Sequence, residues 1–475
     1  MAFPVPFALY YSEPVAPFLV AIATTLVVGF GLEQLTSDRD LGPREAFLMV
    51  ALAWLLVPAV GAIPFVVAGV GAIAHPINAL FEAMSGVTTT GATTLVDFDR
   101  HSRSILMWRQ MIQWLGGLGI LVIATAILSE LGVGGAQLME TEAQTKSSNR
   151  LTPKISETAR LLWKLYVGIT VANIAILFGL HLTGIAPNMT FYNAIAHPLT
   201  TVSTAGFSPE ADSIMAFSPA VQWVIILFMI IGATNFILLL ALLNGNHRRL
   251  LKSEEFRFYL SALGIFSLLV AMFLVLESNH GSGQIEHTIR SAVFNVVSIM
   301  TTTGYANADF DLWGESAKHM LFLCMFIGGM AGSTTCSIKS LRWLVVLKGF
   351  RRDLFTAIHP EAVKPVRLSG GVVDEQTIRD IYAFTLVSLL IFFLATVFVA
   401  IDAARVGLPL TEFEAMGAAA ATFFNIGPAF GILGPFGTYE VLPMSTKVVM
   451  IFLMWIGRIE IIPVLVLFTQ AFWRS

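Results

Sequence analysis

The segment SGVTTTGATT, residues 85–94, lies between two long apolar runs and places three threonines directly before Gly91. Three similar segments end at other glycines: VSTAG at Gly206, MTTTG at Gly304 and FFNIG at Gly427. Each follows a long apolar run and a short apolar segment, and each precedes a polar turn and a second long apolar run. The sequence therefore predicts four copies of one unit: membrane helix, half-helix, extended polar loop, membrane helix.

The composition is that of a membrane protein. Of 475 residues, 56% are hydrophobic and only 12% are charged, whereas a soluble domain carries about 25% charged residues. We therefore expect an all-α polytopic protein in a lipid bilayer, with no nucleic-acid partner. The runs that reach the spanning length of about 20 residues are 46–70, 105–131, 219–243, 258–276, 381–401 and 447–470.

Lysine and arginine predict the orientation, because they concentrate on the cytoplasmic side. The links between the repeats are rich in them, and the loops beside the four glycines carry few: Arg100, Arg103, Arg290, Arg405 and Lys447. We therefore expect cytoplasmic links, and four parallel repeats whose glycine loops enter from outside. The link residues are Lys146, Arg150, Lys154 and Arg160; Arg248, Arg249, Lys252 and Arg257; and Lys348, Arg351, Arg352, Lys364, Arg367 and Arg379.

The same features divide the chain into five parts. An N-terminal region with one extra spanning helix precedes the repeats, and the second and fourth repeats each include the cytoplasmic loop before them. The third repeat contains a glycine-rich interruption within the membrane. The parts are 1–43, 44–140, 141–246, 247–350 and 351–475.

The four glycine loops are candidate ion ligands. Irregular backbone at bilayer depth survives only when it is buried in protein or lines a wet cavity, so four equivalent loops most simply meet at one axis. There, backbone carbonyls and threonine or serine hydroxyls can replace the water shell of a monovalent cation. Glycine permits the positive φ that turns carbonyls to the axis, and each half-helix ends with its negative dipole toward the ion. The predicted filter residues are Val87, Thr88, Thr89, Thr90 and Gly91; Val202, Ser203, Thr204, Ala205 and Gly206; Met300, Thr301, Thr302, Thr303 and Gly304; and Phe424, Asn425, Ile426 and Gly427.

An ordinary turn or a helix-packing patch is the alternative for any single loop of this kind. Four copies in equivalent contexts favour the filter. No nucleophile–base set or metal motif is visible in the sequence, and we expect no enzymatic activity.

In its motifs the chain resembles the Trk/Ktr/HKT superfamily of potassium transporters, and within it the bacterial TrkH/TrkG type. The resemblance implies four repeats around one pseudo-fourfold pore, K⁺ as the transported ion, no organic cofactor and a place in the bacterial inner membrane. It also implies a homodimer and a cytosolic nucleotide-binding ring like TrkA that controls opening. The motifs are FEAMSGVTTTGATTL (81–95), RQMIQWLGGLGI (109–120), TVSTAGFSP (201–209), VVSIMTTTGY (296–305), FIGGMAGSTTCSIK (326–339), NIGPAFG (425–431) and GRIEIIPVLVLF (457–468).

Glycine in all four filters resembles the potassium-selective members of that superfamily. K⁺ is then expected at Thr88, Thr89, Ser203, Thr204, Thr301, Thr302, Asn425 and Ile426. The sequence departs from the family pattern at two places. Only 14–32 reads as spanning before the first repeat, where the family has two helices, and the glycine-rich break of the third repeat contains Thr335, Cys336 and Ser337.

Segment 316–347 is too long and too polar in its middle for one simple span. By resemblance its glycine-rich part is an intramembrane loop that blocks the pore below the filter; a glycine packing face is the alternative. Arg458 lies within the last apolar run, and by resemblance it faces the pore as a positive barrier, with an ion pair to Glu460 as the alternative. Lys339 fits a pore-lining cation or a snorkelling end residue equally well. The predicted gate residues are Gly328, Gly329, Gly332, Ser333, Thr334, Thr335, Lys339 and Arg458.

Acidic pairs follow the first three filters, and we hypothesise that they concentrate cations around an outer mouth. The alternative is that they are ordinary solvated loop residues. Whether transport is passive or coupled to protons or sodium stays open; the sequence shows no buried carboxylate or histidine chain that would form a proton relay. The acids are Asp97 and Asp99, Glu210 and Asp212, and Asp309 and Asp311.

Overall fold

The computed structural model describes residues 1–35, 43–126, 155–277 and 285–474. Within these ranges the regular structure is helical, apart from a two-stranded antiparallel pair, β1 (Arg367–Leu368) and β2 (Gly371–Val372). The link residues Lys146, Arg150 and Lys154 lie outside the described residues.

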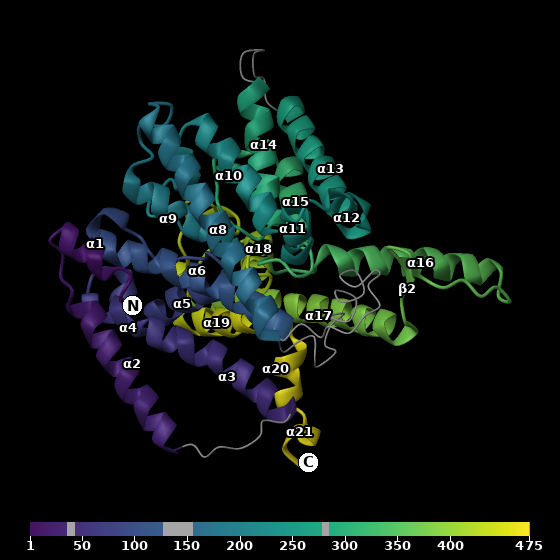
Figure 1. The fold of residues 1–475 in the computed structure, drawn as a ribbon, viewed down its shortest axis with the longest axis horizontal. Coiled ribbons are helices and arrows are strands. Elements are labelled where there is room, and N and C mark those ends of the chain that lie inside the picture. Colours follow the sequence, from purple (N-terminus) through teal and green to yellow (C-terminus); the bar gives the residue numbers. More distant parts are fainter. Residues whose placement is uncertain (36–42, 127–154, 278–284, 475) are drawn as a thin grey trace.

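The predicted unit occurs four times. A long helix comes first in each repeat, then a short buried helix, then the glycine loop and a further helix (Figure 1). The long helices are α3 (Pro43–Gly61), α8 (Ile155–Leu182), α13 (Glu254–Glu277) and α17 (Glu375–Arg405). The short helices are α5 (Pro76–Val87), α9 (Phe191–Val202), α14 (Ile285–Met300) and α18 (Glu412–Phe423). The helices after the loops are α6 (Arg103–Ala126), α10 (Pro219–Gly232), α15 (Glu315–Cys324) and α19 (Met444–Arg458).

The remaining helices connect or flank these repeats. The spanning helix expected at 14–32 is α2 (Ala16–Leu35), which lies on the outside of the bundle beside α4 (Ile63–Ala68) (Figure 1). The smaller pieces are α1 (Val5–Tyr10), α11 (Phe236–Leu243), α12 (His247–Lys252), α20 (Ile462–Leu467) and α21 (Gln470–Arg474). Helix α16 (Ser340–Ile358) extends away from the bundle (Figure 1).

Local chemistry explains where the half-helices begin. An unpaired backbone N–H in the first turn needs an acceptor, and three half-helices receive one from a capping side chain. His75 accepts from Ile77, Thr190 accepts from Asn193, and Thr411 forms a capping box with Glu414. The C-terminal ends of all four half-helices are buried.

Two apolar runs predicted as single spans are broken. In 219–243, α10 and α11 meet at 105°, because Asn235 caps a new helix by accepting from the N–H groups of Ile237 and Leu238. The run 447–470 is interrupted after α19, where Glu460 and Ile461 have positive φ. The interruption predicted within 316–347 is confirmed, since no helix covers the segment between α15 and α16.

Length and composition fit a multi-pass membrane protein. Within the described ranges, five helices are long and apolar enough to cross a bilayer, and the bent α10–α11 pair makes a sixth if it counts as one span. The half-helices pack inside this shell, with α5 against α6 and α19, and α9 against α6 and α8. The bundle therefore brings the four glycine loops to its centre.

Candidate ion-conduction site

The four filter glycines form a closed ring around one axis. A Cβ atom placed on Gly91 would lie 2.4 Å from the Ala205 carbonyl oxygen of the second repeat. The same construction on Gly206, Gly304 and Gly427 meets the carbonyl of the next repeat in turn: Thr303 at 1.9 Å, Ile426 at 2.1 Å and, closing the circle, Thr90 at 2.7 Å. The four loops therefore lie edge to edge, as the sequence predicts for loops that share one axis.

The filter backbone has one conformation repeated four times. The residue two before each glycine has positive φ between 51° and 55°, and each glycine has positive φ between 77° and 105°. A non-glycine residue in this region is uncommon and strained, so four equivalent examples mark a constrained site. The residues are Thr89, Thr204, Thr302 and Asn425.

The filter N–H groups turn back onto their half-helices. In the first repeat Thr89 donates to the Gly86 carbonyl and Thr90 to the Ser85 carbonyl. The other three repeats have the same pattern, for example Ala205 to Thr200. Because N–H and C=O point in opposite directions across a planar peptide, the carbonyls of the preceding residues point away from the half-helix. The Ser203 carbonyl among them also accepts from Thr204 Oγ1 at 2.8 Å.

The fourth filter differs in register from its predicted ion ligands. Counting back from the glycine, the residues equivalent to Thr88 and Thr89 are Phe424 and Asn425. Ile426 instead corresponds to Thr90, and its carbonyl lies against Gly304.

Several filter hydroxyls are already used within the protein. The hydroxyls of Thr88, Ser203 and Thr301 donate to carbonyls of their own half-helices. Two buried oxygens at the strained position, Thr89 Oγ1 and Asn425 Oδ1, have no hydrogen-bond partner among the described residues. An unpaired buried acceptor is costly. Asn425 Nδ2 donates to the Met454 carbonyl of α19 at 2.9 Å, so this side chain packs behind the ring.

A cavity opens above the ring. All four filter glycines line it, together with Arg109, Glu210 and residues of the loops that follow the filters. Of the six acids that we hypothesised to concentrate cations around an outer mouth, Glu210 is the one that lines this cavity. Asp97 pairs with Arg100 instead, and Asp309 caps the short helix at Phe310–Leu312. The hypothesis of six acids around one mouth therefore gains support at one position.

Asp311 is turned toward the fourth repeat, where Oδ1 accepts from the N–H of Gly431 at 2.8 Å. Burial, together with the nearby Asp309, raises the pKa of this carboxyl to about 6. A raised carboxyl pKa favours folding at low pH, and this contribution is lost as pH rises through about 6.

We therefore expect Asp311→Asn to raise the thermal midpoint at pH 7.5 by a few degrees, roughly 2–4 °C. The amide keeps the acceptor for Gly431 and removes the buried charge. At pH 4 the variant and the unmodified protein should melt together, as followed by intrinsic fluorescence in detergent. Asp212→Asn, at an exposed position, is the control; an equal gain from it would contradict the argument.

The loop between α15 and α16, residues 325–339, lies directly beneath the filter; we call it the inner loop. The N–H of Cys336 donates to Thr302 Oγ1 at 3.0 Å, and Thr334 Oγ1 lies 3.0 Å from Thr204 Oγ1. These partners are two of the four strained filter residues, so the inner loop caps the filter from below.

Arg458 anchors the inner loop. The guanidinium is buried and donates to the Thr334 carbonyl at 2.9 Å, the Cys336 Sγ at 2.8 Å and the Gly116 carbonyl at 3.1 Å. Glu460, the partner in the alternative interpretation, pairs with Arg342 instead.

Lys339 is buried, and its Nζ donates to the Thr335 carbonyl within the inner loop. A snorkelling side chain extends to water, so that alternative is wrong. The remaining predicted gate residues also lie in the inner loop. Gly328 pairs with Lys339 in an isolated bridge, and Ser333 Oγ donates to the Met330 carbonyl.

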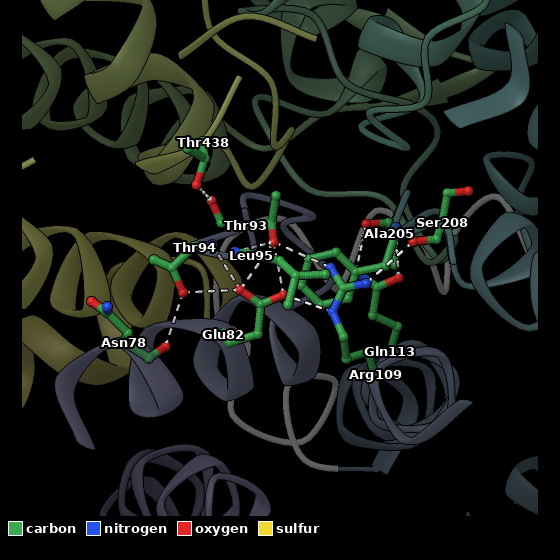
Figure 2. A network of polar contacts seen from close by, with 11 residues as sticks. Asn78, Glu82, Thr93, Thr94, Leu95, Arg109, Gln113, Ala205, Ser208 and Thr438 are labelled. Carbon is green, nitrogen blue, oxygen red and sulfur yellow. Dashed lines mark hydrogen bonds and ion pairs between the residues drawn. The ribbon is translucent and has the colours of Figure 1, made fainter. Parts of the chain in front are cut away.

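Sequence reasoning missed a polar network behind the first and second filters (Figure 2). Its centre is a buried ion pair, with Arg109 Nε 2.8 Å from Glu82 Oε1. Gln113 spans the second filter, donating to the Ala205 carbonyl at 2.7 Å and accepting from the N–H of Phe207 at 2.9 Å. Two opposite charges within apolar segments of one repeat were a signal that could have found the pair.

Comparisons with known proteins agree with this geometry. The family model TrkH, described as a cation transport protein, matches residues 16–475. The Trk system potassium uptake protein TrkH of Halomonas elongata is 36% identical over 96% of this chain and 92% of its own length. TrkH of Escherichia coli K12 is 35% identical over 92% of this chain and 87% of its own.

A solved structure extends the similarity to three dimensions. The crystal structure of the potassium transporter TrkH from Vibrio parahaemolyticus superposes with a TM-score of 0.87 at 31% identity. The match covers all of this chain and 96% of the other. The chain belongs to the TrkH family of cation transport proteins, a family of transporters and not of enzymes.

Proposed function

We propose that this protein takes up potassium through a single pore whose filter is the ring of four glycine loops. The observation that carries the proposal is the closed contact sequence from Gly91 through Gly206 and Gly304 to Gly427. Carbonyls that point away from four half-helices onto one axis are the ligands of a dehydrated monovalent cation. The proposed K⁺ ligands are the backbone oxygens of Thr88, Thr89, Ser203, Thr204, Thr301, Thr302, Phe424 and Asn425.

The protein's relatives are named potassium uptake proteins of the Trk system, and this supports K⁺ as the cargo. We further propose that the inner loop and Arg458 form the gate, and that a cytosolic ring like TrkA controls it. We also propose that the protein is a homodimer in the bacterial inner membrane. The links between its repeats would then lie on the cytoplasmic side. The hydrogen bonds from the inner loop to Thr204 and Thr302 support the gate, because they close the filter from below.

Uptake of ⁸⁶Rb⁺ into proteoliposomes tests the function. We expect uptake driven by an outward K⁺ gradient, competition by external K⁺ and much weaker competition by Na⁺. Empty liposomes, and liposomes with the Gly206→Ala variant, are the controls. Equal competition by Na⁺ and K⁺ would overturn the potassium filter.

Coupled symport is the second candidate mechanism. A passive pore gives a reversal potential that follows the K⁺ gradient alone, whereas a symporter's reversal potential also shifts with a pH or Na⁺ gradient. We expect no shift when pH is changed on one side at constant K⁺. A shift that tracks the proton gradient would establish coupling and leave the filter proposal intact.

A further inference from the structure

Three of the four half-helices carry a polar side chain at one shared register. Glu82, His197 and Asn295 each lie nine residues before the filter glycine of their repeat, and Ala418 occupies this position in the fourth. All three polar residues are buried. A buried polar group needs a hydrogen-bond partner, and the partner of each of these three side chains shows what the side chain holds in place.

Each of the three reaches the chain just beyond its own filter. The contacts join Glu82 Oε2 to the N–H of Thr94 at 2.8 Å, His197 Nε2 to Ser208 Oγ at 3.1 Å, and Asn295 Nδ2 to Asn307 Oδ1 at 2.9 Å. The filter is therefore tied at both ends in these repeats: to the half-helix it follows, and through the side chain to the loop it enters.

The first repeat has the strongest of these ties, because its carboxylate is half of an ion pair. Glu82 and Arg109 have side chains exposed by 0% and 1%. The guanidinium also donates to Thr93 Oγ1 and to the Ser208 carbonyl, both at 3.2 Å (Figure 2). Thr93 follows the first filter and Ser208 follows the second, so one planar group joins two neighbouring filters.

We propose that Glu82 and Arg109 are positioning residues that set the ion selectivity of the filter, by holding the outer ends of the first and second loops at a fixed distance. The proposal rests on the proposed function. A planar guanidinium has a fixed fork of donors that lysine cannot reproduce, and removing one partner of a buried pair leaves the other charge uncompensated. Without the pair, the two loops can separate and admit ions of another size.

The test measures the K⁺/Na⁺ permeability ratio from reversal potentials in planar bilayers. We expect Glu82→Gln and Arg109→Lys each to lower this ratio by about tenfold, which corresponds to about 1.4 kcal/mol of differential binding. Glutamine keeps an acceptor for Thr94 and removes the charge; lysine keeps the charge and loses the fork.

Asp402→Asn is the matched control for a purely structural role. Asp402 is also a buried, ion-paired carboxylate, 2.8 Å from Arg405 and bonded to Ser445 and Thr446, in helices that contribute to neither of these filters. We expect it to lower the thermal midpoint while the permeability ratio stays within about twofold of the unmodified protein. A similar fall in the ratio for Asp402→Asn, or an unchanged ratio for Glu82→Gln, would overturn the proposal.

Thr93→Val provides a milder variant if the charged-pair variants fail to insert. Valine keeps the shape of Thr93 and removes the hydroxyl that contacts both Glu82 and Arg109. We expect the permeability ratio to fall by about threefold, less than one lost buried charge would cause; an unchanged ratio would count against the pair. If the unmodified protein itself showed no preference for K⁺, the proposed function would fail, and that outcome is distinct from failure of the pair.

Discussion

Replacing Gly206 with alanine should abolish selective uptake. The added Cβ would lie 1.9 Å from the Thr303 carbonyl oxygen and 2.9 Å from its carbon, and backbone atoms of a filter cannot move away without losing their geometry. The positive φ of 77° adds a strain of about 1–2 kcal/mol for a residue with a Cβ. That strain alone corresponds to about a tenfold effect, and the steric overlap increases it. The measurement is ⁸⁶Rb⁺ uptake into proteoliposomes.

The geometry of the ring also predicts how the loss of uptake should rank among alanine variants of the four glycines. Cβ distances of 1.9, 2.1, 2.4 and 2.7 Å at Gly206, Gly304, Gly91 and Gly427 should give the largest loss at Gly206 and the smallest at Gly427. Gly264→Ala is the control, because Gly264 lies within α13 and a Cβ there meets nothing within 4 Å. Full uptake by the Gly206→Ala variant would show that ions do not pass through the ring.

Replacing Arg458 with alanine should increase leak through the closed protein. Arg458 makes two contacts with the inner loop, to the Thr334 carbonyl and to Cys336 Sγ, and hydrogen bonds from a charged group contribute about 1.5–3 kcal/mol each. Losing them should shift the equilibrium away from the closed loop and raise unregulated uptake by roughly tenfold or more. Uptake of ⁸⁶Rb⁺ in the absence of any cytosolic partner measures this leak.

Arg458→Lys separates two explanations for that leak. If the positive charge is the barrier, lysine preserves it and the leak stays low. If the planar donors hold the loop, lysine cannot span Thr334, Cys336 and Gly116 together, and the leak rises. We expect the second result, and Arg405→Ala, at the C-terminal end of α17, is the control for a lost arginine. If both Arg458 variants leaked no more than the unmodified protein, Arg458 would not be the anchor of the inner loop.

The sequence predicted the four glycine loops because their chemistry is local. Three of the four loops have threonine or serine within the three residues before glycine, and all four follow an apolar segment too short to span; this pattern needs no tertiary information to recognise. The bend between α10 and α11 also had a local signal, an asparagine before an apolar run, but the apolar residues on both sides suggested a single span.

The side-chain network behind the filters could not be derived in the same way. Glu82 meets Thr94 and Arg109 across the filter loop and the chain that follows it. The two opposite charges indicated a pair, but their spacing along the sequence does not show that the pair also holds Thr93, Thr94 and Ser208. The outer acids were ambiguous for a related reason. A loop carboxylate such as Asp311 can face the mouth or a neighbouring repeat, and tertiary packing turned it toward Gly431.

The 105° bend in the second repeat has a mechanical consequence for the third. Where α10 stops, it leaves carbonyls that no helical turn can use, and the inner loop takes them: Met330 donates to Ala233, and Thr334 Oγ1 donates to Gly232. A hydrogen bond also runs in the opposite direction: the N–H of Phe236, in α11, donates to the Gly332 carbonyl of the inner loop. Hydrogen bonds that run in both directions between two buried segments cannot be released one at a time without leaving polar groups unpaired in the protein interior. The α10–α11 bend and the inner loop should therefore move together as one rigid unit. If one of them moves alone, water must enter to bind the polar groups that it leaves.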